Sequence, residues 1–141
     1  MSSSAQPQPT PGSPASVLAA ARAHQEWVRQ GEAALMVDAV EWASMHEPVG
    51  DTPAASWWVH GVSIELAGVG APSVTEDAVA EFAAAVGMST DQGRRYLGHA
   101  LEIAYRLPTT WKQVKAGTTP VWRATRIAEH TMCLPPEAAE F

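Results

Sequence analysis

The sequence holds a single cysteine, Cys133, among its 141 residues. One cysteine excludes an internal disulfide and is typical of proteins that stay in a reducing compartment. Long apolar runs are also missing, since no window approaches the roughly 20 apolar residues that a membrane-spanning helix needs. The apolar run at 17–21 is short, follows no basic segment and ends at Arg22, so it does not resemble a secretory signal. These absences predict a cytoplasmic protein with no membrane partner.

The sequence also lacks the motifs of common catalytic and metal sites. It contains no Gly-rich phosphate loop and no Gly-x-Ser-x-Gly turn. His130 and Cys133 could supply two zinc ligands, but a structural zinc site needs four, so the pair is interpreted as incidental. Carboxylates such as those of Glu76 and Glu81 are typical of helix caps and solvated faces rather than of acid–base pairs. We therefore expect no catalytic residue, no metal and no cofactor, and thus not an enzyme.

Basic residues are scarce and unevenly placed. The chain has a net charge of −6, yet seven of its nine basic residues lie after residue 88. Residues 94–126 contain all seven of them and a single acidic residue, Glu102. Such a distribution allows the basic part of a chain to meet a phosphate backbone while the rest stays acidic.

Composition divides the chain into a tail and one domain. Residues 2–14 contain four prolines and no large apolar side chain, which predicts a disordered tail at 1–14. The remaining residues, 15–141, are sufficient for one hydrophobic core. Residues 134–137 resemble the start of a further helix just before the chain ends. A single helical domain with a truncated C-terminal end is therefore expected.

The first half of this domain predicts one long helical segment. Residues 15–47 contain little that would break a helix except Gly31, which allows a split into two helices. Apolar side chains recur every seven residues, at Ala21, Val28, Leu35 and Trp42, and give one apolar face. The simpler interpretation is that this face covers the domain's own core, and the alternative is a seam in a homodimer.

Residues 48–73 combine turn-forming residues with apolar ones and predict a short helix or an ordered loop. Trp57 and Trp58 lie in this stretch. A tryptophan pair can stack on nucleobases, although anchoring in the core is the simpler role.

Four further helices are expected at 74–86, 89–106, 109–116 and 120–132. Two of them follow capping-box patterns, Ser73 with Glu76 and Ser89 with Gln92. Thr118 or Thr119 should cap the last one. Periodicity places Ile127 with the inward residues of that helix, whereas Arg95, His99, Glu102 and Arg106 are expected on the outer face of helix 89–106.

Residues 81–97 have the pattern of a helix-turn-helix hairpin. Ala83 suits a close crossing of two helices, Gly87 suits the turn, and Ser89 caps the second helix. In such a hairpin the second helix can lie in the major groove of DNA. The same pattern also occurs where two helices simply pack together, and Asp91 in the first turn would repel phosphate, so both interpretations stay open.

The segment from "GAPSVTEDAVAEFAAAVGMSTDQGRRYLGHALEIAYRLPTTWKQVKAGTTPVWRATRIAEH" to the closing "LPPEAA" resembles the domain of unknown function 222, also met in 13E12-repeat proteins. The resemblance covers residues 70–139 and includes the Gly-Met-Ser turn, the Arg-Arg-Tyr-Leu helix and the Arg-Ala-x-Arg-Ile-Ala helix. In that family the helical region commonly precedes an HNH nuclease domain. The resemblance thus implies a role beside a DNA-cleaving enzyme, although this chain lacks the HNH motif itself.

These observations together predict an all-α domain of five or six helices, with a helix-turn-helix-like hairpin at about 74–106. Its expected function is a non-catalytic accessory domain that binds double-stranded DNA or targets an HNH nuclease, in cis or in trans. The residues expected at the nucleic acid are Thr90, Gln92, Arg94, Arg95, His99, Arg123 and Arg126. The alternative is a protein-interaction or oligomerisation module, such as a homodimer, that does not bind nucleic acid.

Overall fold

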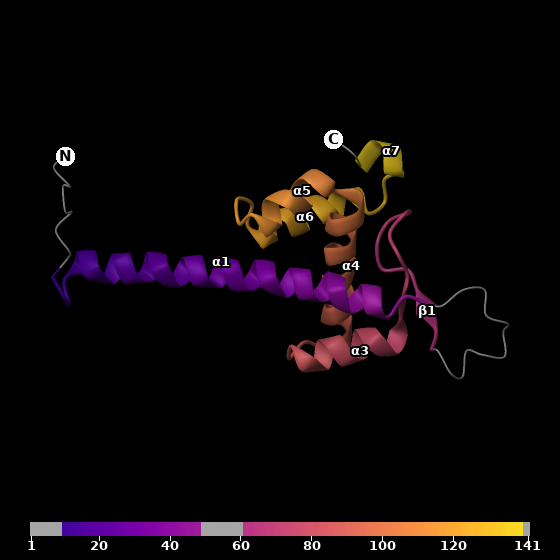
Figure 1. The fold of residues 1–141 in the computed structure, drawn as a ribbon, viewed down its shortest axis with the longest axis horizontal. Helices are drawn as coiled ribbons and strands as arrows, with labels where there is room; N and C mark the ends of the chain where they lie inside the picture. The colour runs from indigo at the N-terminus through magenta and orange to yellow at the C-terminus, as the bar shows by residue number, and fades with distance from the viewer. Residues whose placement is uncertain (1–9, 49–60, 140–141) are drawn as a thin grey trace.

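The computed structural model describes residues 10–48 and 61–139. Within these residues, six helices and one pair of two-residue strands form a mostly helical fold (Figure 1). The predicted helical fold class is confirmed, with the strand pair as an addition. Residues 1–9 of the expected tail lie outside the described residues, as do Trp57 and Trp58.

The helices are α1 (Pro14–Met45), α3 (Glu76–Ala85), α4 (Thr90–Arg106), α5 (Pro108–Lys115), α6 (Val121–Thr131) and α7 (Pro136–Ala139). The strands β1 (Ser63–Ile64) and β2 (Val74–Thr75) pair antiparallel. The backbone N–H of Thr75 donates to the carbonyl of His46 at 3.3 Å, which ties β2 to the end of α1. Within residues 10–48 and 61–139, no helix has the length and hydropathy of a bilayer-spanning segment.

Helix α1 is continuous for 32 residues and is capped by the Ser13 hydroxyl, which accepts from the N–H of Ser16 at 3.2 Å. Gly31 does not split it, because helical hydrogen bonding passes through this position without interruption. Only the C-terminal part of α1 packs on the domain, through the buried residues Met36, Ala39 and Ala43. The N-terminal half of α1 projects away from the other helices (Figure 1). Near the middle of α1, Glu26 and Gln30 line a pocket together with Lys115 at the end of α5. The apolar face of α1 therefore covers the core over less than half of its length.

Helix α4 is the centre of the fold. It packs against α1, α3, α5 and α6, with α3 on one side of α1 and the α5–α6 pair on the other (Figure 1). Its inward residues Leu97, Ala100, Leu101 and Ile103 are fully buried. Because neighbours surround its C-terminal half, side chains on more than one face of this half are enclosed.

This enclosure overturns one sequence expectation. Glu102 and Arg106 were expected on the outer face of α4, but their side chains are 0% and 3% exposed. Arg106 Nη1 donates to both carboxylate oxygens of Glu102, at 2.8 and 2.9 Å. The sequence pattern treated charged residues as outward-facing, whereas a charge is tolerated inside when it is paired and hydrogen-bonded.

Two helix starts differ from the expected ones. Helix α3 begins at Glu76 with Thr75 as N-cap and no side-chain cap, because Val74 and Thr75 pair with β1 instead of entering the helix. Helix α6 has Pro120 as N-cap, since the hydroxyls of Thr118 and Thr119 both donate to Gln113. Ile127 is also 39% exposed rather than buried.

Gly98 is required by close packing on α4. A Cβ atom at this position would lie 2.4 Å from the backbone carbonyl oxygen of Leu66, whereas a Cβ at Gly31 would meet nothing within 4 Å. We expect Gly98→Ala to lower the free energy of unfolding by about 1–3 kcal/mol through overpacking. Gly31→Ala should instead raise it by about 0.5–1 kcal/mol through helix propensity. Urea unfolding measures the free energy of unfolding of both variants. Equal changes for Gly98→Ala and Gly31→Ala would contradict the close contact at Gly98.

Candidate nucleic-acid interface

The hairpin of α3 and α4 has the local geometry that the sequence predicted. Gly87 has φ +72°, which is the left-handed conformation that glycine tolerates. The N–H of Met88 donates to the carbonyl of Ala83 at 2.8 Å and closes the turn. Ser89 and Gln92 form a complete capping box, with hydrogen bonds of 3.2 and 2.9 Å. The turn and the start of α4 were thus correctly predicted.

The crossing of α3 and α4 explains the unusual glycine in the second helix. Ala83 is 1% exposed, and a Cβ atom at Gly93 would lie 2.5 Å from its Cβ atom. The two helices therefore approach each other at an Ala–Gly contact. Because α4 contacts α3 through Gly93, the other sides of the first turns of α4 point away from α3.

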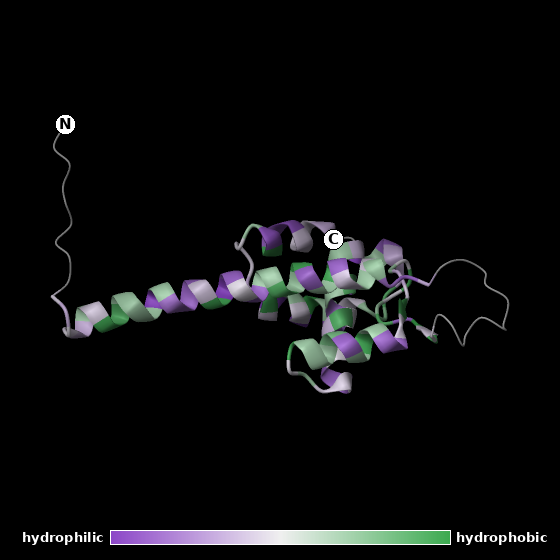
Figure 2. Cartoon of the chain, turned by 60° about the horizontal axis from the view of Figure 1, so that its bottom comes forward, coloured by the Kyte–Doolittle hydropathy of each residue, from purple (hydrophilic) through white to green (hydrophobic). Residues whose placement is uncertain are grey.

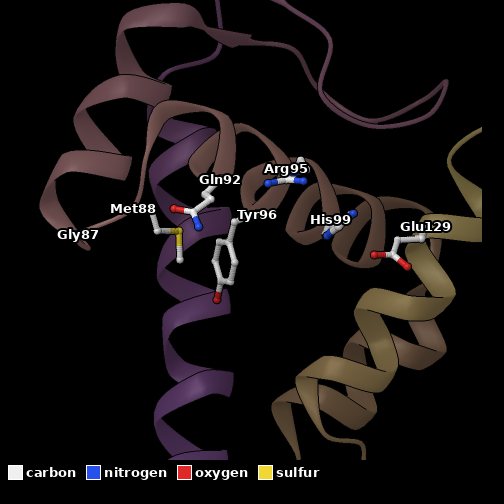
Figure 3. A pocket seen from close by; sticks show the side chains of 7 residues that line it. All are labelled: Gly87, Met88, Gln92, Arg95, Tyr96, His99 and Glu129. Carbon is white, nitrogen blue, oxygen red and sulfur yellow. The ribbon is translucent and has the colours of Figure 1, made fainter.

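One of these faces borders an open cavity of about 490 Å³. From α4 it is lined by Gln92, Arg95, Tyr96 and His99, and from the turn by Gly87 and Met88. Glu129 of α6 closes the opposite side (Figure 3). Three of the seven predicted residues, Gln92, Arg95 and His99, therefore lie together on one face.

Arg94 lies outside this group. Its Nη2 atom is 3.0 Å from Glu76 Oε1 at the start of α3, and both side chains are about half exposed. Thr90, the first residue of α4, is exposed. These two residues are accessible but do not line the cavity.

The two predicted arginines on α6 are also exposed. Arg126 lies 3.6 Å from Glu129, the cavity-lining carboxylate, and is 73% exposed. Arg123 lies over the ring of Trp122, with 5.4 Å between the guanidinium carbon and the ring centroid. Trp122 is itself 61% exposed. Arg126 thus pairs with a residue that lines the cavity but does not line it itself. Arg123 packs on an exposed aromatic ring of the same helix.

Burial and neighbouring charges set the ionisation of two cavity residues. Burial lowers the pKa of His99; Glu129 and Glu102 counteract this, while Arg95 adds to it. His99 is therefore expected to be neutral at pH 7. Burial, with Glu32 and Asp38 of α1, raises the pKa of Tyr96 to about 12. Among the described residues, Arg95 is the one arginine that lines this cavity, and Arg126 lies next to the cavity through its pair with Glu129.

Several residues of the cavity region were not singled out from the sequence. Glu129 comes from a different helix, so spacing along α4 could not reveal it. Trp122 precedes Arg123 and could have been noticed as an aromatic residue beside a basic one. Tyr96 is partly buried and stacks on Phe82, with 6.1 Å between the ring centroids.

Over residues 10–48 and 61–139, no group of three or more His, Cys, Asp or Glu side chains is arranged to hold a metal ion. Cys133 is exposed and has no disulfide. Comparison of the chain with protein-family models, with curated proteins and with solved structures finds no match.

Proposed function

We propose that this chain is a non-catalytic accessory domain that binds double-stranded DNA through the first turns of α4 and the neighbouring face of α6. We further propose that it serves an HNH-type nuclease, in cis or in trans, as the resemblance of residues 70–139 implies. The observation that carries the DNA proposal is the grouping of Gln92, Arg95 and His99 on one open face, with Arg126 at its edge.

The chemistry of this face suits a phosphate backbone. Arginine donates two parallel hydrogen bonds to a phosphate group. The capping box uses Oε1 of Gln92, and its Nε2 can donate to a phosphate or to a base acceptor. The N-terminus of α4, where Ser89 forms the cap, also carries the positive end of the helix dipole. A duplex lying along this face would contact phosphates with arginines from both helices.

Two carboxylates compete for these arginines. Arg94 pairs with Glu76 and Arg126 pairs with Glu129, but both pairs are exposed to solvent. Exposed ion pairs contribute only about 0–1 kcal/mol. Each arginine can therefore exchange its carboxylate for a phosphate at little cost, so the pairs reduce the affinity without preventing binding.

The direct test is a titration of fluorescently labelled duplex DNA at 50 and 200 mM salt. Four arginines, at positions 94, 95, 123 and 126, would contact about four phosphates. Release of their counterions predicts an affinity that falls roughly 100-fold over this salt range. Absence of binding at 50 mM salt, or an affinity that salt does not change, would contradict the proposal. Titration with single-stranded DNA of the same sequence distinguishes duplex binding from binding to any strand.

A further inference from the structure

The projecting half of α1 carries an apolar stripe that no other described part of the chain covers. Val17, Leu18 and Val28 are 62%, 58% and 52% exposed, and every residue from Val17 to Glu32 is exposed. Figure 2 shows hydrophobic residues interspersed with charged ones along this half. Exposed apolar side chains that recur along one face of a helix mark a contact surface.

The stripe has the spacing of a coiled-coil seam. Val17, Ala21, His24, Val28, Gly31 and Leu35 alternate in steps of four and three residues. Such positions are the a and d positions of a heptad repeat, which insert between the side chains of a second helix. Leu18 and Trp27 flank the stripe on its two sides, so the apolar surface is wider than the seam alone.

The charged residues beside the stripe favour pairing with a second copy of this chain that runs antiparallel to the first. Arg22 and Glu32 lie on the same flank, ten residues apart. Consider two copies that run in opposite directions and are related by a two-fold axis near residue 26. Arg22 of each copy then lies within reach of Glu32 of the other, so the dimer contains this ion pair twice. In a parallel pair in register, Arg22 would lie about 15 Å along the axis from Glu32 of the second copy.

The shape of the domain favours the same direction. The helices that pack on α1 lie along its C-terminal half (Figure 1). A parallel partner would place both bodies side by side at one end, where Met36 and Ala39, beside the seam, are buried in the core of the domain. An antiparallel partner places the bodies at opposite ends. Val17 of each copy then lies beside Leu35 of the other.

We infer that the exposed half of α1 is an antiparallel homodimer seam, centred near residue 26. With this centre the two copies overlap from Val17 to Leu35, over a length of about 28 Å at 1.5 Å per residue. Two helices of this length bury on the order of 1,000 Å² in total, which is the low end for specific interfaces. The dimer is therefore expected to dissociate on dilution through the micromolar range. This inference does not depend on DNA binding.

Analytical ultracentrifugation of the full chain at 1–200 μM tests the seam. We expect a concentration-dependent shift from monomer to dimer, with a dissociation constant that Val28→Glu raises at least 10-fold. Ala19→Glu, on the opposite face of the same segment, is the matched control and should leave it within about 2-fold. Arg22→Glu and Glu32→Arg should each weaken the dimer, and the double variant should restore it. A monomer throughout, or equal effects of Val28→Glu and Ala19→Glu, would overturn the seam.

The direction of pairing has its own measurement. A spin label on Ala15→Cys, in a Cys133→Ser background, reports the distance between the two copies. Antiparallel pairing about residue 26 separates the labelled positions by about 33 Å along the axis, whereas a parallel pair keeps them about 10 Å apart. A separation near 10 Å would overturn the antiparallel arrangement. Circular dichroism confirms that each variant keeps its helix content.

Discussion

Glu102→Gln is expected to lower the free energy of unfolding by about 3–5 kcal/mol, because it leaves the Arg106 guanidinium buried without its counter-ion. Both side chains are almost fully enclosed, so water cannot replace the lost carboxylate. A single domain has a total stability of about 5–15 kcal/mol. One isosteric substitution should therefore remove a large part of the stability of this fold.

The size of this effect comes from the number of elements that the pair joins. Glu102 accepts from the N–H of Gly68 at 3.0 Å and from the Thr131 hydroxyl at 2.8 Å. Arg106 Nη1 donates to the carbonyl of Thr131 at 3.2 Å, and Nη2 donates to that of Leu134. The loop before β2, the C-terminal end of α4 and the end of α6 thus meet at two side chains.

Glu26→Gln is the matched control, since it removes the same charge from an exposed pair with Arg29 at 3.7 Å. That variant should change the stability by less than about 0.5 kcal/mol. Urea unfolding followed by tryptophan fluorescence measures both. The double variant Glu102→Leu with Arg106→Met removes both charges together. Its free energy of unfolding should therefore fall by less than the sum of the decreases in the two single variants. If Glu102→Gln lowers the free energy of unfolding no more than Glu26→Gln does, the buried pair does not hold these elements together.

The buried pair also marks the limit of sequence reasoning for this fold. Local signals were sufficient for the approximate position of each helix and for some of the helix ends. Gly87 and the Ser89–Gln92 capping box placed the turn correctly, and Gly117, with φ +72°, follows the end of α5. Such signals act within one turn of the chain and need no knowledge of neighbours. Which face of α4 is enclosed depends instead on four helices packed around it, and hydrophobic periodicity assigns charged residues to the outside by rule.

The same distinction applies to the candidate interface. Gln92, Arg95 and His99 are three of the seven residues predicted at the nucleic acid, and the structure places them on one face of α4 because they are three and four residues apart. The sequence could not separate Arg94 from Arg95, since the adjacent position points toward Glu76 of α3. It also could not place Glu129 opposite His99, since that contact joins residues 30 positions apart on different helices.

Arg95→Glu with Arg126→Glu is expected to weaken duplex DNA binding by more than 100-fold at 50 mM salt. Each substitution replaces a phosphate contact by a repulsive charge on the two helices that border the cavity. Loss of two phosphate contacts should reduce the slope of log affinity against log salt by about 2. Both side chains are exposed, so circular dichroism and urea unfolding should show a fold close to that of the wild type.

The matched control for net charge is Lys112→Glu with Lys115→Glu. This pair changes the charge by the same amount on α5, outside the candidate interface. It should weaken binding by less than about 10-fold, through long-range repulsion alone. Equal losses in the two double variants would mean that DNA senses only the overall charge, and the face of α4 and α6 would not be a binding site.

A gain of binding is the more demanding test, because damage to the fold cannot produce it. Glu129→Gln removes the carboxylate that pairs with Arg126 at 3.6 Å and lines the cavity beside His99. Arg126 is then free to meet a phosphate, and the repulsion between Glu129 and the DNA backbone disappears. We expect an affinity several-fold higher than that of the wild type at 50 mM salt, measured by the same titration. Glu137→Gln, on α7, removes the same charge elsewhere and should produce a smaller gain. If the two variants bind equally, Glu129 does not border the DNA.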